Sequence, residues 1–496
     1  MSIVKNAGSD IPTLSHRDQV LIDGEWAAAT GERTIEVVDP STEEVVAAVR
    51  ESSVDDIARA ARAARVAFDR GPWPRTSPQH RADVIDEFAT RLTARVEDLA
   101  QAATAEIGMP ILMARASQAY AIDYLRYYAD LARSFPFRED RARRDGAITR
   151  ILREPVGPTA IIVPFNGAFP TACMKLAPAL AAGCTVVVKP SPDTPLAVSI
   201  LAEVTAELTR DGLLPPGVVN VVVADREGSE ALVAAPEIDK VTFTGSTAVA
   251  RKIISTVGQR IGRVTLELGG KSAAIVLDDA PLDQTVPPLL AGGLINTGQA
   301  CFGLTRVLVS QARRDELVDA MKAHIGTLVI GNAHEESTTT GPLSGQRHRA
   351  RVENYLEVAL GEGARVAIGG GRPDDLDRGF FFEPTVLVDV DNSMRIAREE
   401  IFGPVVSVLT YSDVDDAVAI ANDNDYGLGG AVFSTDIEGA FGIAQRIRTG
   451  TVSVNGFVGS HVTTPFGGYK QSGVGREGGV EGLEPFLEAK SVHMPS

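Results

Sequence analysis

The amino-acid sequence predicts an α/β protein with two doubly wound sheets of mainly parallel strands. Short runs of β-branched and apolar residues alternate with helical stretches of ten or more residues, which is the pattern of βαβ units. The strand runs are almost continuously apolar, as expected for sheets that are covered on both faces. This alternation begins near residue 159 and again near residue 272, so we expect two separate sheets.

Helices dominate the first third of the chain, after a short β-like opening at VLIDGEW and RTIEVVDP. Residues 53–70, 80–106 and 110–135 carry apolar side chains at helical spacing. Ser53 and Asp56 have the spacing of a capping box, which predicts the start of the first of these helices.

A charged insert, REDRARRDGAITRILRE at 138–154, precedes the first sheet. We expect the strands of that sheet at TAIIVP, TVVVKP, VVNVVV, KVTFTG and RVTLEL, with helices between them, including 170–182 and 195–210. The strands of the second sheet are expected at SAAIVLD, RVLVS, VSVLTY, GAVFS and TVSVN, between residues 272 and 455.

Length and charge narrow the classes of function. A chain of 496 residues is long enough for two or three domains. Its net charge of −17 repels nucleic-acid phosphates and anionic lipid, so we expect neither nucleic acid nor a membrane as a partner. The longest apolar run, 176–188, is too short to span a bilayer, and the N-terminus lacks the apolar stretch of a signal peptide. Three cysteines are too few for a disulfide framework, and we expect a cytoplasmic protein.

Polar residues stand at the carboxyl ends of four strands in the first sheet, where ligands of open parallel sheets bind. They offer an amide, a cation, a glycine turn that opens a helix, and a carboxylate. These groups fit a nucleotide-binding site with a catalytic centre beside it. They belong to the segments Pro164–Asn166, Lys189–Ser191, Thr244–Ser246 and Glu267–Gly270.

Each of these groups also has a simpler explanation. Gly245 and Ser246 either offer helix N–H groups to a pyrophosphate or only form a turn. Lys189 either meets a ribose or phosphate or is solvated, as most lysines are. Glu267 either has a raised pKa that suits a general base or lies at the surface of an alternating strand. The residue types alone leave these alternatives open.

The segment NTGQACFGLTR places Cys301 between Gly298 and Gly303. Free cysteines are commonly buried core residues, but a core strand would flank Cys301 with alternating apolar residues rather than small and polar ones. Backbone N–H groups of such a loop can stabilise a thiolate or an oxyanion. Metal chemistry is not expected, because the seven histidines are scattered and no cysteine pair has metal-binding spacing.

Seven motifs occur in the order found in the aldehyde dehydrogenase superfamily, which the chain resembles over nearly its whole length. They are VPFN, VVVKPS, FTGS, LELGGKS, GQAC, EEIFGP and PFGGYKQSGVGRE. The resemblance is to the non-acylating, NAD(P)-dependent branch. It implies a Rossmann-like cofactor domain at 1–137 and 155–267, a catalytic domain at 268–472, and a small β oligomerisation element at 138–154 and 473–496.

The resemblance implies that the protein oxidises an aldehyde to the carboxylic acid with NAD(P). Cys301 is then the nucleophile, which forms a thiohemiacetal and afterwards a thioester. The side-chain amide of Asn166 and the backbone N–H of Cys301 form the oxyanion hole, and Glu267 activates the water that hydrolyses the thioester.

A cofactor site is implied in the same way. Lys189 and Glu400 are expected to hold the two riboses, Gly245 and Ser246 to meet the pyrophosphate, and Phe402 to pack by the nicotinamide. The complete set of residues expected at the cofactor is Val163, Pro164, Phe165, Lys189, Ser191, Gly245, Ser246, Leu268, Glu400 and Phe402.

Three positions depart from the family pattern. Phe165 stands where tryptophan is common, and Ala250 stands where the phosphate turn often has a second glycine. Pro192 stands where an acidic residue frequently binds the adenosine ribose, and its absence removes a repulsive element against a 2′-phosphate. We expect NAD as the cofactor, with NADP as the alternative and Asp193 as a substitute for the missing carboxylate.

An apolar aldehyde is the expected substrate. The candidate pocket residues Gly167, Met174, Phe302 and Phe457 are small or apolar, which suits an aliphatic, terpenoid or aromatic aldehyde. No arginine marks a dicarboxylate semialdehyde, and no aromatic cage marks a quaternary ammonium.

Two other functions fit these residues less well. A dehydrogenase that passes the thioester to coenzyme A usually lacks a carboxylate at the position of Glu267, and a non-catalytic protein of this fold would not need Cys301, Glu267 and Asn166 together. The insert and the C-terminal tail are expected to form the strand pairing that builds a homodimer or a homotetramer.

Overall fold

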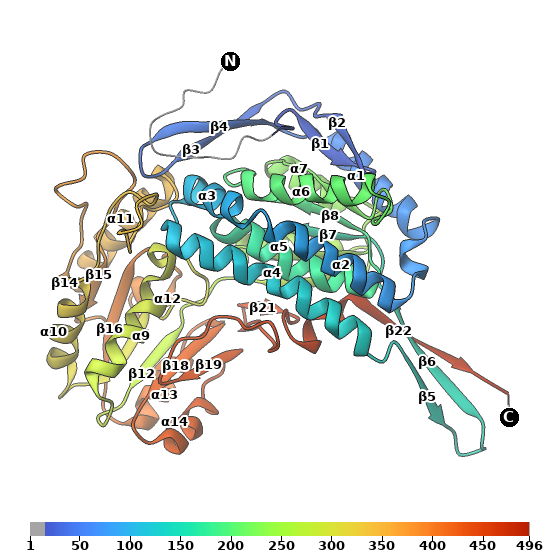
Figure 1. Ribbon diagram of the computed structural model, residues 1–496. Coiled ribbons are helices and arrows are strands. Elements are labelled where there is room, and N and C mark those ends of the chain that lie inside the picture. Colours follow the sequence, from blue (N-terminus) through green and yellow to red (C-terminus); the bar gives the residue numbers. More distant parts are fainter. Residues whose placement is uncertain (1–14, 496) are drawn as a thin grey trace.

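The computed structural model describes residues 15–495 and confirms the predicted α/β fold class. It contains an eight-stranded sheet and a seven-stranded sheet with helices packed on them, together with smaller β elements (Figure 1). Within the described residues, no helix is long and apolar enough to cross a membrane.

Parallel strands form the centre of the eight-stranded sheet, and antiparallel strands lie at its two ends. The strands are β1 (Gln19–Ile22), β2 (Glu25–Ala28), β7 (Thr159–Ile162), β8 (Val186–Lys189), β9 (Val219–Val221), β10 (Lys240–Thr244), β11 (Arg263–Glu267) and β21 (Gly473–Val474). Their order is β2-β1-β9-β8-β7-β10-β11-β21. β1 runs antiparallel to β9, and β21 runs antiparallel to β11. All five central strands are among those expected from the sequence.

Alternate residues of the central strands point into two different cores. Ile161 and Val188 belong to a core shared with five helices, whereas Ala160 and Val187 belong to a core on the opposite face. This two-sided burial explains the continuous apolar strand runs. The five helices are α2 (Pro78–Thr93), α3 (Val96–Ile107), α4 (Ile111–Ser134), α5 (Ala168–Ala182) and α6 (Leu196–Arg210). The opposite face carries α1 (Val54–Asp69), α7 (Arg226–Ala234) and α8 (Thr247–Gly258).

The helix starts and ends agree with the sequence analysis in most places. The capping box of α1 is present, because Ser53 accepts the N–H of Asp56 and the Asp56 carboxylate accepts the N–H of Ser53. The stretch 80–106 differs, since it is divided into α2 and α3 at Ala94 and Arg95. Neither glycine nor proline marks this break, so helical spacing alone does not reveal it.

The seven-stranded sheet is parallel except at one edge. Its strands are β12 (Ala273–Val276), β13 (Arg306–Ser310), β14 (Arg365–Ile368), β15 (Thr385–Val388), β16 (Val405–Tyr411), β18 (Gly429–Phe433) and β19 (Thr451–Val454). Their order is β14-β15-β16-β13-β12-β18-β19, with β14 antiparallel to β15. The sequence analysis expects all of these strands except β14 and β15. The associated helices are α9 (Leu282–Leu294), α10 (Arg314–Ile325), α11 (Gln346–Gly361), α12 (Arg395–Arg398), α13 (Val414–Asn422) and α14 (Ile437–Ala444).

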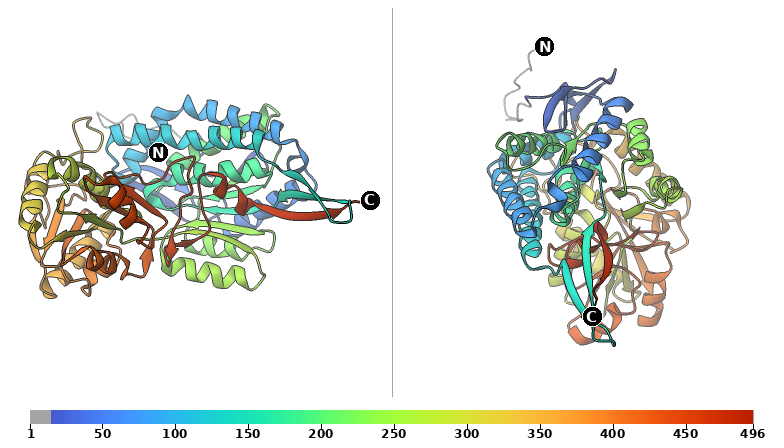
Figure 2. Two further views of the ribbon diagram at one scale, coloured as in Figure 1. Left: turned by 90° about the horizontal axis from the view of Figure 1, so that it is seen from below. Right: turned by 90° about the vertical axis from the view of Figure 1, so that its right-hand side faces the viewer.

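Three smaller β elements complete the fold. β3 (Thr34–Asp39) pairs with β4 (Glu44–Arg50), and β17 (Tyr426–Gly427) pairs with β20 (Tyr469–Lys470). The third element joins the charged insert to the C-terminal tail and projects from the body as an arm (Figures 1 and 2). Its strands are β5 (Arg138–Ala142), β6 (Ile148–Pro155) and β22 (Leu487–His493), in the order β22-β6-β5.

Candidate active site

The strand order of the eight-stranded sheet reverses at β7. β8 and β9 lie on one side of β7, and β10 and β11 lie on the other. Ligands of open α/β sheets bind at such a reversal, beyond the carboxyl ends of the strands. A cavity of about 900 Å³ lies there, which is large enough for a dinucleotide.

Every residue that the sequence analysis places at the cofactor lines this cavity, and so do Cys301 and Asn166. Their elements converge from both sheets: the loops after β7, β8, β10 and β11 supply one side, and loops of the seven-stranded sheet supply the other. The cofactor set consists of Val163, Pro164, Phe165, Lys189, Ser191, Gly245, Ser246, Leu268, Glu400 and Phe402.

Two further parts of the cavity wall are not among the residues predicted from the sequence. One is a slot with apolar lining between α7 and α8, which includes Val233, Val249 and Ile253. The other is the first turn of α11, which brings Arg347 and His348 to the cavity. No motif marks these residues, because they reach the cavity only through the packing of separate helices.

The start of α8 fits a pyrophosphate. Gly245 precedes the helix, and a side chain at this position would overlap the ring of Phe243, so glycine lets the turn pack against this ring. Ser246 is the N-cap and accepts the N–H of Val249, while the first N–H groups of a helix remain open to a ligand. The position of Ala250 is fully buried against the core, so the departure from glycine there does not face the cavity.

Lys189 and Glu400 line the cavity, and each retains hydrogen-bonding capacity for a polar ligand. The Lys189 ammonium donates to the carbonyls of Pro190 (2.7 Å) and Ala224 (3.0 Å), which leaves one of its three donors free. Burial lowers the pKa of Lys189 to about 8. The Glu400 carboxylate accepts the N–H of Gly270 at 3.2 Å, and burial raises its pKa to about 7. A dinucleotide with two riboses therefore fits the donors and acceptors of this cavity.

Aromatic side chains close the end of the cavity that lies nearest to Cys301. Phe402 has a left-handed backbone (φ +63°), which is rare for a bulky residue and marks a position held by its surroundings. Its ring meets the edge of Phe165 at 5.6 Å, and Phe165 stacks on His348 at 4.4 Å. Burial lowers the pKa of His348 to about 4, so the imidazole is neutral at physiological pH.

The loop that holds Cys301 has an unusual backbone. Asn296, Thr297 and Gly298 are consecutive left-handed residues, with φ of +49°, +56° and +71°. The Thr297 hydroxyl donates to the Gly341 carbonyl at 3.0 Å, and so fixes the loop to the segment before α11. Such strained conformations persist only where neighbouring contacts fix them, and they gather at functional sites.

Cys301 is half-buried beside two carboxylates. Burial raises the pKa of its thiol, and the carboxylates of Glu400 and Glu267 raise it further. The backbone N–H groups of Cys301 and Phe302 act in the opposite direction, because they point toward the sulfur. The same N–H groups are suitable donors for an oxyanion.

Asn166 belongs to the short 3-10 turn Phe165–Gly167, directly after β7. Its side-chain amide donates to the Gln299 carbonyl at 2.9 Å, two residues before Cys301. One N–H of the amide is therefore used to hold the Cys301 loop, and the second N–H is available to a ligand. The structure thus brings Asn166 and Cys301 together.

Glu267 ends β11 and is only 1% exposed. Neither carboxylate oxygen has a hydrogen-bond partner, and the side chain does not line the dinucleotide cavity. Burial holds the pKa of Glu267 well above its usual range, and the carboxylate of Glu477 raises it further, while Lys175 and Arg476 lower it. Lys175 and Glu477 form a buried ion pair beside it.

Of the four candidate pocket residues, Phe302 and Phe457 contact each other. Phe302 stacks on Phe457 at 5.5 Å and meets the edge of Phe466 at 5.9 Å, which forms an apolar cluster next to Cys301. Met174 is half-buried and packs against the core under the eight-stranded sheet, and Gly167 borders a cavity of about 10 Å³, so their place at the substrate stays a prediction.

Tyr120 of α4 forms hydrogen bonds with the loop that carries Phe457. Its hydroxyl donates to the Ser460 carbonyl at 3.3 Å and accepts the N–H of Val462 at 3.1 Å. The sequence analysis missed Tyr120, because only the folded loop reveals this role.

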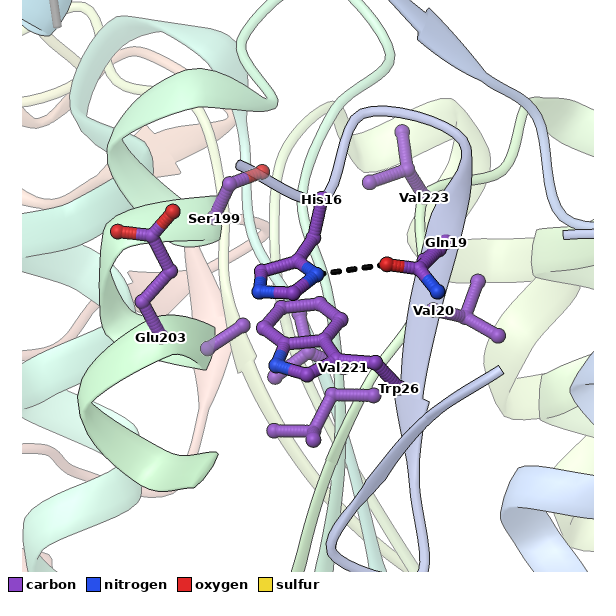
Figure 3. A pocket seen from close by; sticks show the side chains of 10 residues that line it. His16, Gln19, Val20, Trp26, Ser199, Glu203, Val221 and Val223 are labelled. Carbon is purple, nitrogen blue, oxygen red and sulfur yellow. Dashed lines mark hydrogen bonds between the residues drawn. The ribbon is translucent and has the colours of Figure 1, made fainter. Parts of the chain in front are cut away.

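A second cavity lies between β1, β2 and α6 (Figure 3). The ring of His16 stacks on Trp26 at 4.0 Å, and its Nδ1 atom lies 2.6 Å from Gln19 Oε1. The volume of about 20 Å³ holds no more than a water molecule, so this cavity is not a site for a metabolite.

The Gly298→Ala substitution is expected to lower both stability and activity. Residue 298 has φ +71°, and a Cβ atom there would overlap the carbonyl of Gly403. Left-handed strain and this overlap together should reduce the free energy of unfolding by about 2–4 kcal/mol. Thermal unfolding and the steady-state rate measure the two effects. Gly303→Ala is the matched control, because its Cβ would lie 3.3 Å from the nearest atom and its φ is not left-handed. Equal effects in both variants would contradict this account.

The model of the aldehyde dehydrogenase family matches residues 26–492. The chain belongs to the aldehyde dehydrogenase family. The family and fold predicted from the sequence are therefore confirmed, and this aldehyde dehydrogenase is an oxidoreductase that converts an aldehyde into the carboxylic acid.

Similar proteins cover nearly the whole chain. Geranial dehydrogenase of Castellaniella defragrans is 44% identical and aligns over 97% of this chain and 99% of its own length. The 3-succinoylsemialdehyde-pyridine dehydrogenase of a Pseudomonas species is 40% identical, with 95% and 97% covered.

Two solved structures share the fold closely. Mycobacterium tuberculosis aldehyde dehydrogenase, complexed with NAD+, has a TM-score of 0.94 and 42% identity, with 97% of this chain and 99% of the other covered. A mutant of Pseudomonas syringae aldehyde dehydrogenase C, complexed with NAD+ and octanal, has a TM-score of 0.92 and 40% identity, with 98% of both chains covered.

Proposed function

We propose that this aldehyde dehydrogenase oxidises an apolar aldehyde, and that Cys301, Asn166 and Glu267 perform the chemistry. One observation carries the proposal: the Cys301 thiol lies in the wall of the dinucleotide cavity, and the next residue, Phe302, belongs to an apolar aromatic cluster. Two similar proteins, a geranial dehydrogenase and an enzyme complexed with octanal, support an apolar substrate.

NAD is the cofactor of this enzyme, as the sequence predicts. When bound, it supplies the oxidant that takes up hydride from the substrate carbon. Lys189 and Glu400 would hold the riboses, and the start of α8 at Gly245 and Ser246 would hold the pyrophosphate. Phe402 and Phe165 would pack beside the nicotinamide, at the end of the cavity nearest to Cys301.

Cys301 forms the covalent intermediates. Its thiol first loses its proton to water, the sulfur then adds to the aldehyde carbon, and the resulting oxyanion accepts hydrogen bonds from the Asn166 amide and the Cys301 N–H. Loss of hydride from this thiohemiacetal leaves a thioester on Cys301.

Glu267 completes the turnover. As the carboxylate, it takes a proton from the water that attacks the thioester carbonyl, and the carboxylic acid leaves while the Cys301 thiolate is restored. Its burial and its unpartnered oxygens suit a base that must be free to meet water. This residue also favours hydrolysis over transfer to coenzyme A.

The domain organisation and assembly expected from the sequence remain proposals. We infer a cofactor domain at 1–137 and 155–267, a catalytic domain at 268–472, and an oligomerisation element at 138–154 and 473–496. Both outer strands of the arm, β5 and β22, have one unpaired edge, and such edges are templates for pairing with another chain. This supports a homodimer or homotetramer. The three cysteines are free thiols, which supports a reducing cytoplasm.

The aldehyde preference can be measured directly. Steady-state kcat/KM should rise about tenfold from hexanal to octanal, because each buried methylene contributes about 0.8 kcal/mol. Geranial should be oxidised comparably to octanal. Succinic semialdehyde and betaine aldehyde should be at least about 100-fold poorer, since their charges would lose hydration without a partner. A charged aldehyde that matches octanal would contradict the apolar assignment while leaving the chemistry of Cys301 intact.

A further inference from the structure

The dinucleotide cavity has a recognisable adenosine end. Cys301 and Phe402 mark the nicotinamide end, and the start of α8 marks the pyrophosphate. Beyond α8's first turn, the lining of Val233, Val249 and Ile253 between α7 and α8 offers an apolar slot for a flat base. The adenosine ribose then lies over the end of β8, beside Lys189.

This end of the cavity has no free carboxylate among the residues that line it. Sites that prefer NAD usually have an acidic side chain on the ribose hydroxyls, which also repels the 2′-phosphate of NADP. Pro192 removes the usual acidic residue. The lining carboxylates each have a cation partner: Asp193 with Arg347, Asp225 with Arg33, and Glu230 with Arg226.

One of these ion pairs joins two separate parts of the cavity wall. Asp193 follows β8, whereas Arg347 lies in the first turn of α11, which packs on the other sheet. The Arg347 guanidinium lies 3.3 Å from the Asp193 carboxylate, and both side chains line the cavity. Their side chains are 78% and 49% exposed, so the pair is accessible to a ligand that enters.

We propose that the Asp193–Arg347 ion pair sets the choice between NAD and NADP, and that the enzyme accepts both cofactors. In the pair, Arg347 neutralises Asp193, so the carboxylate neither replaces the missing acidic residue nor repels a 2′-phosphate. When NADP binds, Arg347 turns from Asp193 to the phosphate. This inference rests on the shared aldehyde dehydrogenase activity and not on the identity of the aldehyde.

The exchange of partners is energetically easy. An exposed ion pair contributes about 0–1 kcal/mol, so opening it requires little free energy. A guanidinium binds a phosphate through charge-assisted hydrogen bonds, which are stronger than neutral ones. Because the groups are exposed, added salt should weaken the contact with the phosphate.

Binding of the reduced cofactors tests the proposal without turnover. Titrations of NADH and NADPH, followed by nicotinamide fluorescence, give both dissociation constants for the full-length enzyme in the absence of aldehyde. Wild-type protein should bind NADPH within about tenfold of NADH at low salt, and higher salt should weaken NADPH more than NADH.

Two conservative variants separate the roles of the pair. Arg347→Gln should weaken NADPH about tenfold relative to NADH, because it removes the phosphate partner and leaves Asp193 unneutralised. Asp193→Asn should shift the ratio about tenfold toward NADPH, because it frees Arg347 and removes a negative charge. Arg372→Gln is the control, since it breaks another exposed ion pair, with Glu353, that does not line the cavity.

Each possible result of these titrations either supports or overturns the proposal. Opposite shifts in the two variants, with Arg372→Gln unchanged, support the proposal. A wild-type preference for NADH of 1,000-fold or more, or equal effects of Arg347→Gln on both cofactors, overturns it. Binding does not depend on which aldehyde is the substrate, so an error in the aldehyde assignment leaves this measurement intact.

Discussion

Replacing Cys301 by alanine is expected to abolish aldehyde-dependent NADH formation, with a loss of at least about 1,000-fold in kcat. The sulfur is the only atom of the enzyme that bonds to the substrate carbon in this mechanism. NADH binding, measured by fluorescence, should stay within a few-fold of wild type, because the cavity wall is otherwise unchanged.

Cys173 provides a matched control for this experiment. It is also a free thiol, but it is fully buried in the core beneath the eight-stranded sheet, away from the cavity lining. Cys173→Ala should therefore retain the aldehyde-dependent rate. Full activity in Cys301→Ala, or the same loss in both variants, would show that the nucleophile is assigned wrongly.

Replacing Glu267 by glutamine is expected to stop the enzyme after the oxidation step. Rapid mixing with aldehyde and NAD should give a burst of about one NADH for each active site, followed by a steady rate that is about 100- to 10,000-fold lower than wild type. The glutamine amide cannot take a proton from water, so the thioester on Cys301 accumulates. Mass spectrometry of the quenched protein should show the acyl group.

The pH dependence of steady-state turnover tests the role of Glu267 independently. Burial and Glu477 raise the pKa of Glu267, so the carboxyl is neutral below this raised pKa and becomes a base only above it. Wild-type steady-state turnover should therefore rise with pH as Glu267 ionises, and Glu267→Gln should lack this rise. Unimpaired steady turnover in the glutamine variant would remove Glu267 from the mechanism.

The two sheets and the catalytic residues can be predicted from the sequence more readily than the residues that line the cavity. Strands such as β8 and β12 are buried on both faces, so their apolar runs stand out in a linear pattern. Cys301, Asn166 and Glu267 stand in ordered motifs, and the fold brings their segments to one place. β14, in contrast, is a partly exposed edge strand with a mixed pattern, and nothing in its composition distinguishes it from a loop.

Residues that act through packing could not be predicted in this way. His348 and Arg347 reach the cofactor cavity because α11 packs against the seven-stranded sheet and its first turn faces the other sheet. That Met174 and Gly167 meet the substrate stays a prediction, because the direction of the Met174 side chain depends on how α5 sits on the sheet. Spacing along the sequence does not reveal contacts between separate helices and strands.

The strand β21 has a consequence for how the enzyme is made. Residues 473–474 pair with β11 at its Leu266 and Glu267, so the edge of the eight-stranded sheet is finished by residues translated after the whole seven-stranded sheet. A nascent chain folds from its N-terminal part as it leaves the ribosome. Until the last segment arrives, the strand that carries Glu267 has an open edge, and the nearby Glu477 is missing. A nascent chain that lacks this segment therefore holds the Cys301 thiol without the finished surroundings of Glu267, and the site is completed only when residues 473–496 are in place.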